Sequence, residues 1–500
     1  MMSFRHALAY APLIGGAFIV AAPCAAQSQA QIDRLQQQIQ ALQEQLQSLQ
    51  AQVNASAKAQ SAAPPPAVPQ SAAAPAAVPP PGPRVTQSAT NKLGIESADG
   101  KYSIALTGRI HLDAGDYINV DPASRATNPS NLSSGFNARR ARIGVTGKAF
   151  GDWTYTFIYD GGNSNDATAA GIETAQITYK GFKGVALDFG YSDVPFTLDE
   201  ATSSNDIMFM ERATPGIIAT SFNTGDFRSN AGARFFGDRY WLGAYFTGPA
   251  SGQSHALTAE QFGAFQRGTF QVLQGTDYSL HLGIGVAELL KAPNTGIGTA
   301  NTITLRDAPE LRIDPTAILN TGTLGSVDNP VTGGTVFNLE TAAGYKNFFW
   351  QGEYFHYALD RRGLKQANFD GGYGEASWTL TGESRKYMPE TGAYSAIVPQ
   401  RPFSLAEGGW GAWELAGRVS YVDLNDNFTS GLPLAGQPSA VAGGSQTAYT
   451  LGLNWYVNSN IRFMLNYVHA DIDKNNLAAP VGAATGATVD AIALRSQVAW

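Results

Sequence analysis

The chain has little of what soluble enzymes and helical membrane proteins usually carry. Its 500 residues include one cysteine and six histidines, and 15% are charged, against about 25% in typical soluble domains. No apolar run reaches the roughly 20 residues of a membrane-spanning helix, and residues 7–22 come nearest. The sequence contains no phosphate-binding loop, nucleophile elbow or zinc-ligand spacing. We therefore predict neither an enzyme nor a bound cofactor, and nothing indicates a nucleic-acid partner.

The first 26 residues are typical of a secretory signal. Arg5 and His6 precede an apolar stretch over residues 8–22, and Cys24-Ala25-Ala26 matches a small-residue cleavage site. Acylation of Cys24, as in a lipoprotein, is the alternative, and Pro23 directly before the cysteine disfavours it. Because Cys24 is the single cysteine, we expect the mature chain to hold no disulfide and no thiolate metal site.

Residues 27–60 form a separate predicted element. Its apolar residues follow a 3,4 spacing without a break: Ile32, Leu35, Ile39, Leu42, Leu46, Leu49 and Val53. This heptad seam predicts a coiled-coil oligomerisation segment, with the solvated helix of a monomer as the alternative. The spacing does not fix the number of helices. Residues 61–92 begin with an Ala/Pro-rich stretch and predict an extended linker.

From residue 93 to residue 500 the hydrophobic pattern has a period of two. In the final stretch one face carries Ile492, Leu494, Val498 and Trp500, and the other carries Ala493, Arg495, Gln497 and Ala499. Long alternating runs with aromatic residues on the apolar face are typical of a transmembrane β-barrel, in which aromatic girdles mark the membrane interfaces. A soluble β-sandwich would have shorter strands and a polar outer face.

The alternating runs predict a 16-stranded antiparallel outer-membrane β-barrel. Their spans are 101–113, 137–149, 152–160, 172–181, 184–192, 229–237, 239–247, 278–287, 308–314, 335–346, 348–358, 370–382, 411–423, 446–458, 460–471 and 487–500. An even number of strands is the rule for bacterial single-chain barrels.

The lengths of the connections test this strand assignment independently. Very short turns, at Phe150-Gly151, Phe182-Lys183, Asp238, Lys346-Asn347 and Ser459, all follow even-numbered strands. Long connections near 114–136, 193–228, 248–277, 315–334, 424–445 and 472–486 all follow odd-numbered ones. Short periplasmic turns and long outer loops are the expected asymmetry. Two long connections, 288–307 and 383–410, lie on the short-turn side, and the second is a candidate to fold into the pore.

The candidate functional residues are the cations on the lumen parity. Arg140 and Arg142 share one face of their strand, whereas a lipid-facing arginine at the bilayer centre would cost about 2–4 kcal/mol. The same parity places Arg109, Lys180, Arg234, Arg418, Arg462 and Arg495 in the lumen, with Asp113, Asp160, Asp188, Glu353 and Glu414. Arg139, of opposite parity, should lie near the outer interface.

Two interpretations of these arginines remain open. The arginine fork binds carboxylate or phosphate at two points, so a row of arginines would favour passing anions. Alternatively, lumen arginines pair with lumen carboxylates and set pore size and rigidity. Residues 93–500 carry 28 Lys+Arg and 38 Asp+Glu, a net charge of −10, which does not by itself favour anions.

Four stretches together resemble the phosphate- and polyphosphate-selective porin family, porins O and P. They are FNARRARIGVTGKAFGDWTYTFIYD (136–160), LDFGYSDVPFTLDEATSSNDIMFMER (187–212), LTGESRKY (380–387) with GAWELAGRVSYVDL (411–424), and the ending ALRSQVAW, where Trp500 replaces the usual phenylalanine. The resemblance implies a homotrimer of sixteen-stranded barrels in an outer membrane. It also implies that the loop 193–228 folds inward to narrow the pore.

The resemblance implies roles for five arginines without settling the solute. Arg109, Arg140 and Arg142 match the family's arginine ladder, and Arg212 and Arg228 bracket the constriction loop. Arg234 is a further pore-lining candidate because of its lumen parity. The family places lysines near its constriction, but residues 191–228 contain no lysine and six carboxylates.

We therefore expect a bacterial outer-membrane porin with a periplasmic N-terminal segment. Its partners would be outer-membrane lipid and small hydrophilic solutes, or anions such as phosphate. The alternative is a non-selective or weakly cation-selective porin whose coiled coil mainly tethers the membrane to a periplasmic partner.

Overall fold

The computed structural model describes residues 82–87, 92–121, 132–162, 171–222, 226–250, 260–296, 298–429, 434–474 and 486–500, with Gln40 and Glu44. The chain divides into two compact units, Met1–Pro79 and Pro80–Trp500. The predicted signal and nearly all of the predicted coiled coil lie outside the described residues; Gln40 and Glu44 are helical.

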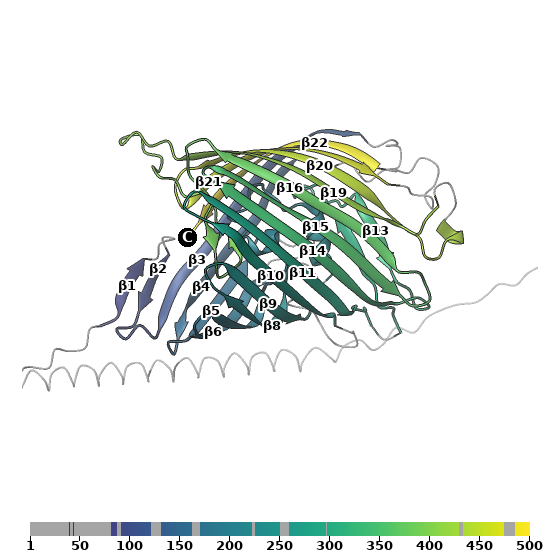
Figure 1. The fold of residues 1–500 in the computed structure, drawn as a ribbon, viewed down its shortest axis with the longest axis horizontal. Coiled ribbons are helices and arrows are strands. Elements are labelled where there is room, and N and C mark those ends of the chain that lie inside the picture. Colours follow the sequence, from purple (N-terminus) through teal and green to yellow (C-terminus); the bar gives the residue numbers. More distant parts are fainter. Residues whose placement is uncertain are drawn as a thin grey trace, which may run out of the picture. The chain divides into compact units, whose positions relative to one another are not determined.

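The second unit is a closed barrel of 16 antiparallel strands (Figure 1). Each strand pairs with the next along the chain, and the last pairs with the first through Arg495 opposite Asp113. The strands are β3 (Ser103–Asp121), β4 (Gly135–Ala149), β5 (Trp153–Asp160), β6 (Gly171–Phe182), β7 (Val185–Asp193), β8 (Phe227–Phe236), β9 (Tyr240–Thr247), β10 (Phe262–Gln274), β11 (Tyr278–Lys291), β14 (Val331–Tyr345), β15 (Phe348–Arg361), β16 (Ala367–Thr379), β19 (Ala412–Asp426), β20 (Val441–Tyr456), β21 (Ile461–Asp473) and β22 (Gly486–Ala499).

Burial alternates along the strands as the period of two predicts. On β20, Leu451 is 62% exposed and faces outward, whereas the neighbouring Thr450 is 1% exposed and faces the lumen. The outer face is apolar and the inner face polar, which is the arrangement of a barrel surrounded by lipid.

One predicted strand is wrong and one real strand was missed. Residues 308–314 form no barrel strand; they lie in the connection between β11 and β14. The missed strand is β10, which the sequence pattern had assigned to a connection. Its outer parity carries Gln266 and Gly268 between Phe262 and Phe270, while Phe265 points inward and is 1% exposed. The alternation is therefore weak, and the two errors cancel in the count.

The corrected strand order removes one of the two irregular connections. Counted along the barrel, β11 is the ninth strand and β14 the tenth, so the segment between them joins an odd-numbered strand to an even-numbered one and belongs with the long loops. It contains β12 (Ile303–Asp307) and β13 (Leu319–Leu324). The five predicted short turns all fall at short connections. The connection from β16 to β19 remains long on the short-turn rim, with β17 (Tyr387–Met388) and β18 (Ala393–Tyr394).

Among the described residues, three connections enter the lumen. We call them loop A (194–226), with α2 (Leu198–Ala201) and α3 (Thr214–Ser221), loop B (292–330) and loop C (380–411). Tyr357 of β15 donates a hydrogen bond to the carbonyl oxygen of Pro215 in loop A (2.6 Å), and Arg267 of β10 donates to the carbonyl oxygen of Gly392 in loop C (2.7 Å). The predictions that 193–228 and 383–410 fold into the pore are confirmed.

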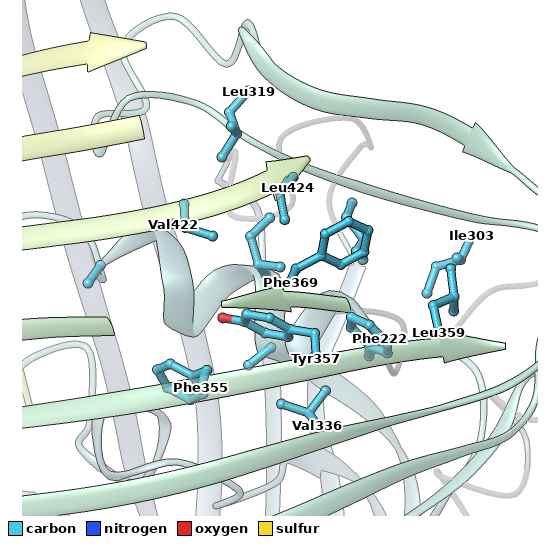
Figure 2. Close-up of a cluster of buried hydrophobic side chains, with 14 of the residues drawn as sticks. Phe222, Ile303, Leu319, Val336, Phe355, Tyr357, Leu359, Phe369, Val422 and Leu424 are labelled. Atoms are coloured by element: carbon cyan, nitrogen blue, oxygen red, sulfur yellow. The ribbon is translucent and has the colours of Figure 1, made fainter. Parts of the chain in front are cut away.

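Part of the lumen is a packed apolar core. Phe222, at the end of α3, stacks on Tyr357 with ring centroids 5.8 Å apart (Figure 2). Around them lie Ile303 and Leu319 from loop B and the inward-facing Val336, Phe355, Leu359, Phe369, Val422 and Leu424. Apolar packing therefore fills part of the lumen beside β14–β19, and charged residues on β3–β8 border a cavity that remains.

A short hairpin pairs with β3 beyond the end of β22 and extends the barrel wall there. β1 (Arg84–Gln87) pairs with β2 (Leu93–Glu96), which pairs with β3 through Gly94 opposite Ala105. Glu96 accepts hydrogen bonds from Arg84 (2.8 Å) and Lys148 (3.1 Å) and fastens the hairpin to β4. This hairpin begins within the stretch predicted as linker.

Trp500 covers Gly108 on the outward face of β3. The two residues exchange backbone hydrogen bonds of 3.0 Å each, and a Cβ at residue 108 would lie 2.5 Å from the Trp500 ring. We expect Gly108→Val to displace the ring and to destabilise the barrel by about 1–3 kcal/mol, the usual cost of overpacking. The unfolding midpoint, followed by tryptophan fluorescence, measures this. Gly135→Val on β4, where a Cβ would meet nothing within 4 Å, is the matched control; equal stability of both variants would contradict the prediction.

Candidate functional site

A β-bulge in β4 reorients the arginine cluster. His111 pairs with Arg140 but Leu112 pairs with Ala138, so Arg139 is the extra residue. A bulge redirects side chains that simple alternation would place on the other face. Arg139 therefore points inward, is 4% exposed and donates two hydrogen bonds to the Glu211 carboxylate (2.8 and 2.9 Å). The prediction that Arg139 lies near the outer interface is wrong.

We call the lumen face of β3, β4 and β22 the arginine wall. Three of its arginines are neutralised by four carboxylates. Arg139 pairs with Glu211, and Arg142 pairs with Asp160 (2.7 Å) and with Glu173. Arg495 of β22 pairs with Asp113 (2.7 Å) and with Glu211 (2.8 Å). These buried pairs join neighbouring strands and hold loop A against the wall.

Arg109 and Arg140 lie on the same wall without a carboxylate. Neither forms an ion pair with any residue that the structure describes. Arg109 Nη1 donates to the Ser204 hydroxyl in loop A (2.6 Å), and Arg140 Nη1 lies 3.4 Å from His111 Nδ1. Arg140 Nε has no hydrogen-bond partner among the described residues. Since a guanidinium donates and does not accept, the positive charge of each arginine stands without a paired carboxylate among the described residues.

His111 is held neutral between these arginines by its hydrogen bonds. Its Nδ1 can only accept from Arg140, so the ring proton lies on Nε2, which donates to Asn205 Oδ1 (3.0 Å). His111 therefore links the arginine pair to loop A without adding charge.

The other three predicted site arginines make contacts within the protein. Arg212 pairs with Glu200 (2.8 Å) and lies 3.9 Å from Asp193, and Arg234 pairs with Asp188 (3.0 Å). Arg228 donates to the carbonyl oxygen of Thr220 (3.2 Å). Burial would lower the pKa of Arg212, but the surrounding carboxylates outweigh it and raise that pKa well above the usual range.

Three carboxylates gather beside Arg212 and Arg228: Asp193 at the end of β7, Glu200 of α2 and Asp226 before β8. Glu200 is 5% exposed, and its Oε1 accepts no hydrogen bond from the described residues. Burial and the negative charge of Glu200 raise the pKa of Asp226 above its usual range.

The arginine wall and the carboxylates face one cavity. It has a volume of about 330 Å³, and its lining includes Arg109, Arg140, Asp193, Glu200 and Asp226. A second cavity of about 290 Å³ lies next to it, lined among others by Lys92, Asp206, Arg462 and Trp500. Arg109 and Ser203 border both, so the contact of Arg109 with Ser204 stands where the two cavities meet.

Acidic pH should make the lumen more positive. Burial raises the pKa values of Asp199, Asp206 and Asp226 of loop A, so these carboxylates lose their charge at a higher pH than ordinary aspartates, whose pKa is about 3.9. We expect the zero-current potential in a KCl gradient to move toward the chloride equilibrium potential between pH 8 and pH 5. A constant potential, or a shift toward potassium, would contradict this.

Most remaining lumen charges anchor the inner loops. Arg418 pairs with Glu310 of loop B (2.6 Å), and Arg385 of loop C pairs with Glu414 of β19 (2.9 Å). Glu353 accepts the backbone N–H groups of Leu198 (2.8 Å) and Asp199 (3.0 Å) at the start of α2. The parity rule found Arg418, Glu353 and Glu414; Glu310 and Arg385 stand in loops, where no periodicity identifies them.

Comparison with known proteins gives one family. The model for phosphate-selective porin O and P matches residues 104–500. Porin O of Pseudomonas aeruginosa is 28% identical over 402 residues, which cover 76% of this chain and 86% of that protein. An uncharacterised protein of Caulobacter vibrioides is 27% identical over 416 residues, covering 81% of this chain and 73% of that protein.

Some solved structures also match, at lower sequence identity. OmpT of Vibrio cholerae, in a trimer form, has 12% identity and a TM-score of 0.47, covering 80% of this chain and 99% of that one. An anion-selective porin from Comamonas acidovorans has 12% identity and a TM-score of 0.46, covering 80% and 100%.

Proposed function

Because the chain belongs to the phosphate-selective porin O and P family, we propose that it passes small hydrophilic solutes and favours small oxyanions, which Arg109 and Arg140 contact. The observation that carries this proposal is the pair of guanidiniums without carboxylate partners in a lumen where other arginines form ion pairs.

The protein lies in the bacterial outer membrane, and the family match supports its role as a channel. The resemblance read from the four sequence stretches is confirmed by the family match. The alternative in which the barrel mainly anchors a periplasmic tether is not favoured by this comparison.

The chemistry of Arg109 and Arg140 suits a transient oxyanion contact. A guanidinium offers fixed donors to phosphate or carboxylate oxygens, and hydrogen bonds to charged groups contribute about 1.5–3 kcal/mol each. Arg109 borders both cavities, so an anion leaving the first would still be held while entering the second. Two contacts that do not surround the anion allow it both to bind and to leave, which conduction requires.

Arg142, Arg212, Arg228 and Arg234 take a supporting role in this proposal. Their contacts with Asp160, Glu200, Thr220 and Asp188 hold loop A and the wall in place. They contribute to the field of the pore, while Arg109 and Arg140 supply the free donors.

Ion-selectivity measurements on the purified chain in planar bilayers test the proposal. We expect open, ohmic channels with a zero-current potential toward chloride and a chloride current that falls as phosphate is added. A barrel that conducts no current would contradict the channel proposal. A cation-selective channel that phosphate does not block would contradict the proposed anion contact.

We also propose a homotrimer whose subunits are joined in part by residues 27–60. The unbroken heptad seam and the family resemblance support this assembly. Deleting residues 27–60 should leave the barrel folded and lower the temperature at which trimers dissociate on a gel. Unchanged trimer melting would show that the seam has another role.

A further inference from the structure

We propose that a groove on the lipid-facing side of β16, β19, β20 and β21 binds a glycolipid of the outer leaflet. An acyl chain would lie along the groove, and the hydroxyls of an uncharged sugar head would contact a polar cluster at its outer end. The groove has a volume of about 630 Å³, within the range of about 300–1,000 Å³ that ligand pockets cover. The four strands are neighbours in the barrel wall (Figure 1).

Small residues on outward positions form the floor of the groove. Ala376 of β16 pairs with Gly417 of β19, and Gly417 pairs with Leu451 of β20. All three line the groove. A Cβ at residue 417 would lie 3.8 Å from Leu451 Cδ2, which is an ordinary contact distance. Strand packing therefore does not require a glycine at this position, and its lack of a side chain leaves the groove open.

The sides of the groove are apolar, as an acyl chain requires. They are formed by the outward-facing Phe348, Trp378, Leu415, Leu451, Leu453, Leu465, Tyr467 and Ile492. Lipid tails are as apolar as these side chains, so binding within the membrane depends on van der Waals packing. A chain that lies in the groove gains contacts from its floor and from both sides, which a flat barrel wall does not offer.

A polar cluster lies at the outer end of the groove. Tyr467 lines the groove and donates a hydrogen bond to Asp490 Oδ1 (2.7 Å). His469, two residues further along β21, contacts two carboxylates: Nδ1 lies 2.7 Å from Asp490 Oδ1, and Nε2 lies 3.3 Å from Asp471 Oδ2. Since both ring nitrogens face acceptors, the ring donates from both and carries a positive charge. Two carboxylates and one imidazolium leave the cluster with one net negative charge.

The position of His469 along its strand places the cluster at the level of the lipid heads. β21 (Ile461–Asp473) begins after the short periplasmic turn and ends at a long outer connection, and His469 is eight residues from its start. Eight steps of about 3.3 Å, tilted by about 40°, raise His469 by about 20 Å. The apolar band of an outer-membrane barrel is about 25 Å tall, so the cluster meets the heads of the outer leaflet.

The exposed carboxylate of the cluster favours a head that donates hydrogen bonds without adding a negative charge. The side chain of Asp471 is 57% exposed, and that of Asp490 is 20% exposed. Sugar hydroxyls donate to carboxylate oxygens, whereas the phosphate of a phospholipid would meet a cluster of the same sign. A lipid with an uncharged sugar head above its acyl chains therefore matches both the cluster and the groove.

A similar cluster on β15 and β16 provides an internal comparison. Tyr354 and His356 both contact Asp370 Oδ1, at 2.5 and 2.9 Å. The strand register places Asp370 opposite His356, the same arrangement as at the outer end of the groove. The lining of the groove does not include these three residues, so we expect them to contribute little to glycolipid binding.

Native mass spectrometry of the full chain in detergent micelles tests the proposal. Glucosyl dioleoylglycerol is added in competition with equal amounts of phosphatidylglycerol and phosphatidylethanolamine that carry the same acyl chains. We expect each subunit to retain one glycolipid, several-fold more often than either phospholipid. Gly417→Leu, which fills the groove, and independently Asp471→Asn, which removes the exposed charge, should each lower glycolipid retention several-fold.

Gly374→Leu and Asp370→Asn are the matched controls. Gly374 is an outward-facing glycine of β16 outside the groove lining, and a Cβ there would lie 3.9 Å from Trp350 Nε1. Both controls should retain the glycolipid as the wild type does. Each variant is first checked for heat-modifiable migration on a gel and for an unchanged single-channel current, because all four substituted side chains face away from the lumen.

Three results would overturn the glycolipid site. They are equal retention of a phospholipid by the wild type, unchanged glycolipid retention in Gly417→Leu or in Asp471→Asn, and equal losses in the control variants. A changed oligomeric state of Gly417→Leu with unchanged glycolipid retention would assign the groove to a second copy of this chain. These outcomes concern the outer face alone, so the proposed channel function stands or falls separately.

Discussion

Replacing Arg109 and Arg140 together by alanine is expected to lower phosphate permeability relative to erythritol by on the order of tenfold or more. Each guanidinium would lose hydrogen bonds to a charged oxygen worth about 1.5–3 kcal/mol, and 1.4 kcal/mol corresponds to tenfold. Because neither arginine forms an ion pair with the described residues, their removal leaves no buried carboxylate without its partner and should leave the barrel folded.

The matched control removes two cations that border neither cavity. Lys183→Ala with Lys346→Ala changes the periplasmic turns after β6 and β14, where salt screens surface charges over about 8–10 Å. We expect this control to change the permeability ratio less than twofold. An equal drop in both double variants would mean that net charge, and no local contact, governs anion passage.

Replacing Glu211 by glutamine should cause the largest loss of stability. The side chain is 6% exposed and accepts from both Arg139 and Arg495. Removing one partner of a buried ion pair costs about 3–5 kcal/mol, because the remaining charge stays desolvated. The variant would remove the carboxylate partner of Arg139 and leave Arg495 paired with Asp113 only, so loop A would lose its ion pairs with β4 and β22.

The denaturant midpoint of unfolding measures this effect, and Glu390→Gln is its control. Glu390 pairs with Lys180 at 2.7 Å, but its side chain is 53% exposed, and such pairs contribute less than about 1 kcal/mol. Similar losses in the two variants would refute the anchoring role of Glu211.

The Glu211 contribution also has a defined pH dependence. Burial would raise the pKa of Glu211, but Arg139 and Arg495 outweigh burial and hold it well below the usual range. A depressed folded-state pKa stabilises the fold fully above the unfolded-state value of about 4.3 and loses that effect as pH falls through the lower folded-state value. The stability difference between wild type and Glu211→Gln should therefore persist at neutral pH and shrink in strong acid.

Alternation predicted the barrel because lipid outside and water inside impose opposite demands on successive residues. It succeeded wherever the outer parity is apolar, as on β20 with Tyr449, Leu451 and Leu453. Alternation failed on β10, where Gln266 and Gly268 occupy outer positions. Phe265 of the same strand packs inward against Tyr245, with ring centroids 4.9 Å apart. An apolar core inside the lumen removes the contrast between the two faces of a strand on which the alternating pattern depends.

The site was predictable as a set of arginines but not as a pattern of pairing. Parity placed Arg109, Arg140 and Arg142 in the lumen, yet the bulge at Arg139 depends on strand register, which one sequence does not reveal. Arg142 meets Asp160 directly across the β4–β5 pairing and Glu173 from β6, one strand further, and Arg495 meets Glu211 across 284 residues of sequence. Which arginines remain without a carboxylate follows only after these partners are known.

The most direct test of the proposed function is the effect of phosphate on chloride current through single channels of the purified chain. We predict an open channel whose chloride current decreases progressively as phosphate is added, because phosphate occupies Arg109 and Arg140. A chloride current that phosphate leaves unchanged, in an otherwise open channel, would contradict the assignment of these two arginines as the anion contact.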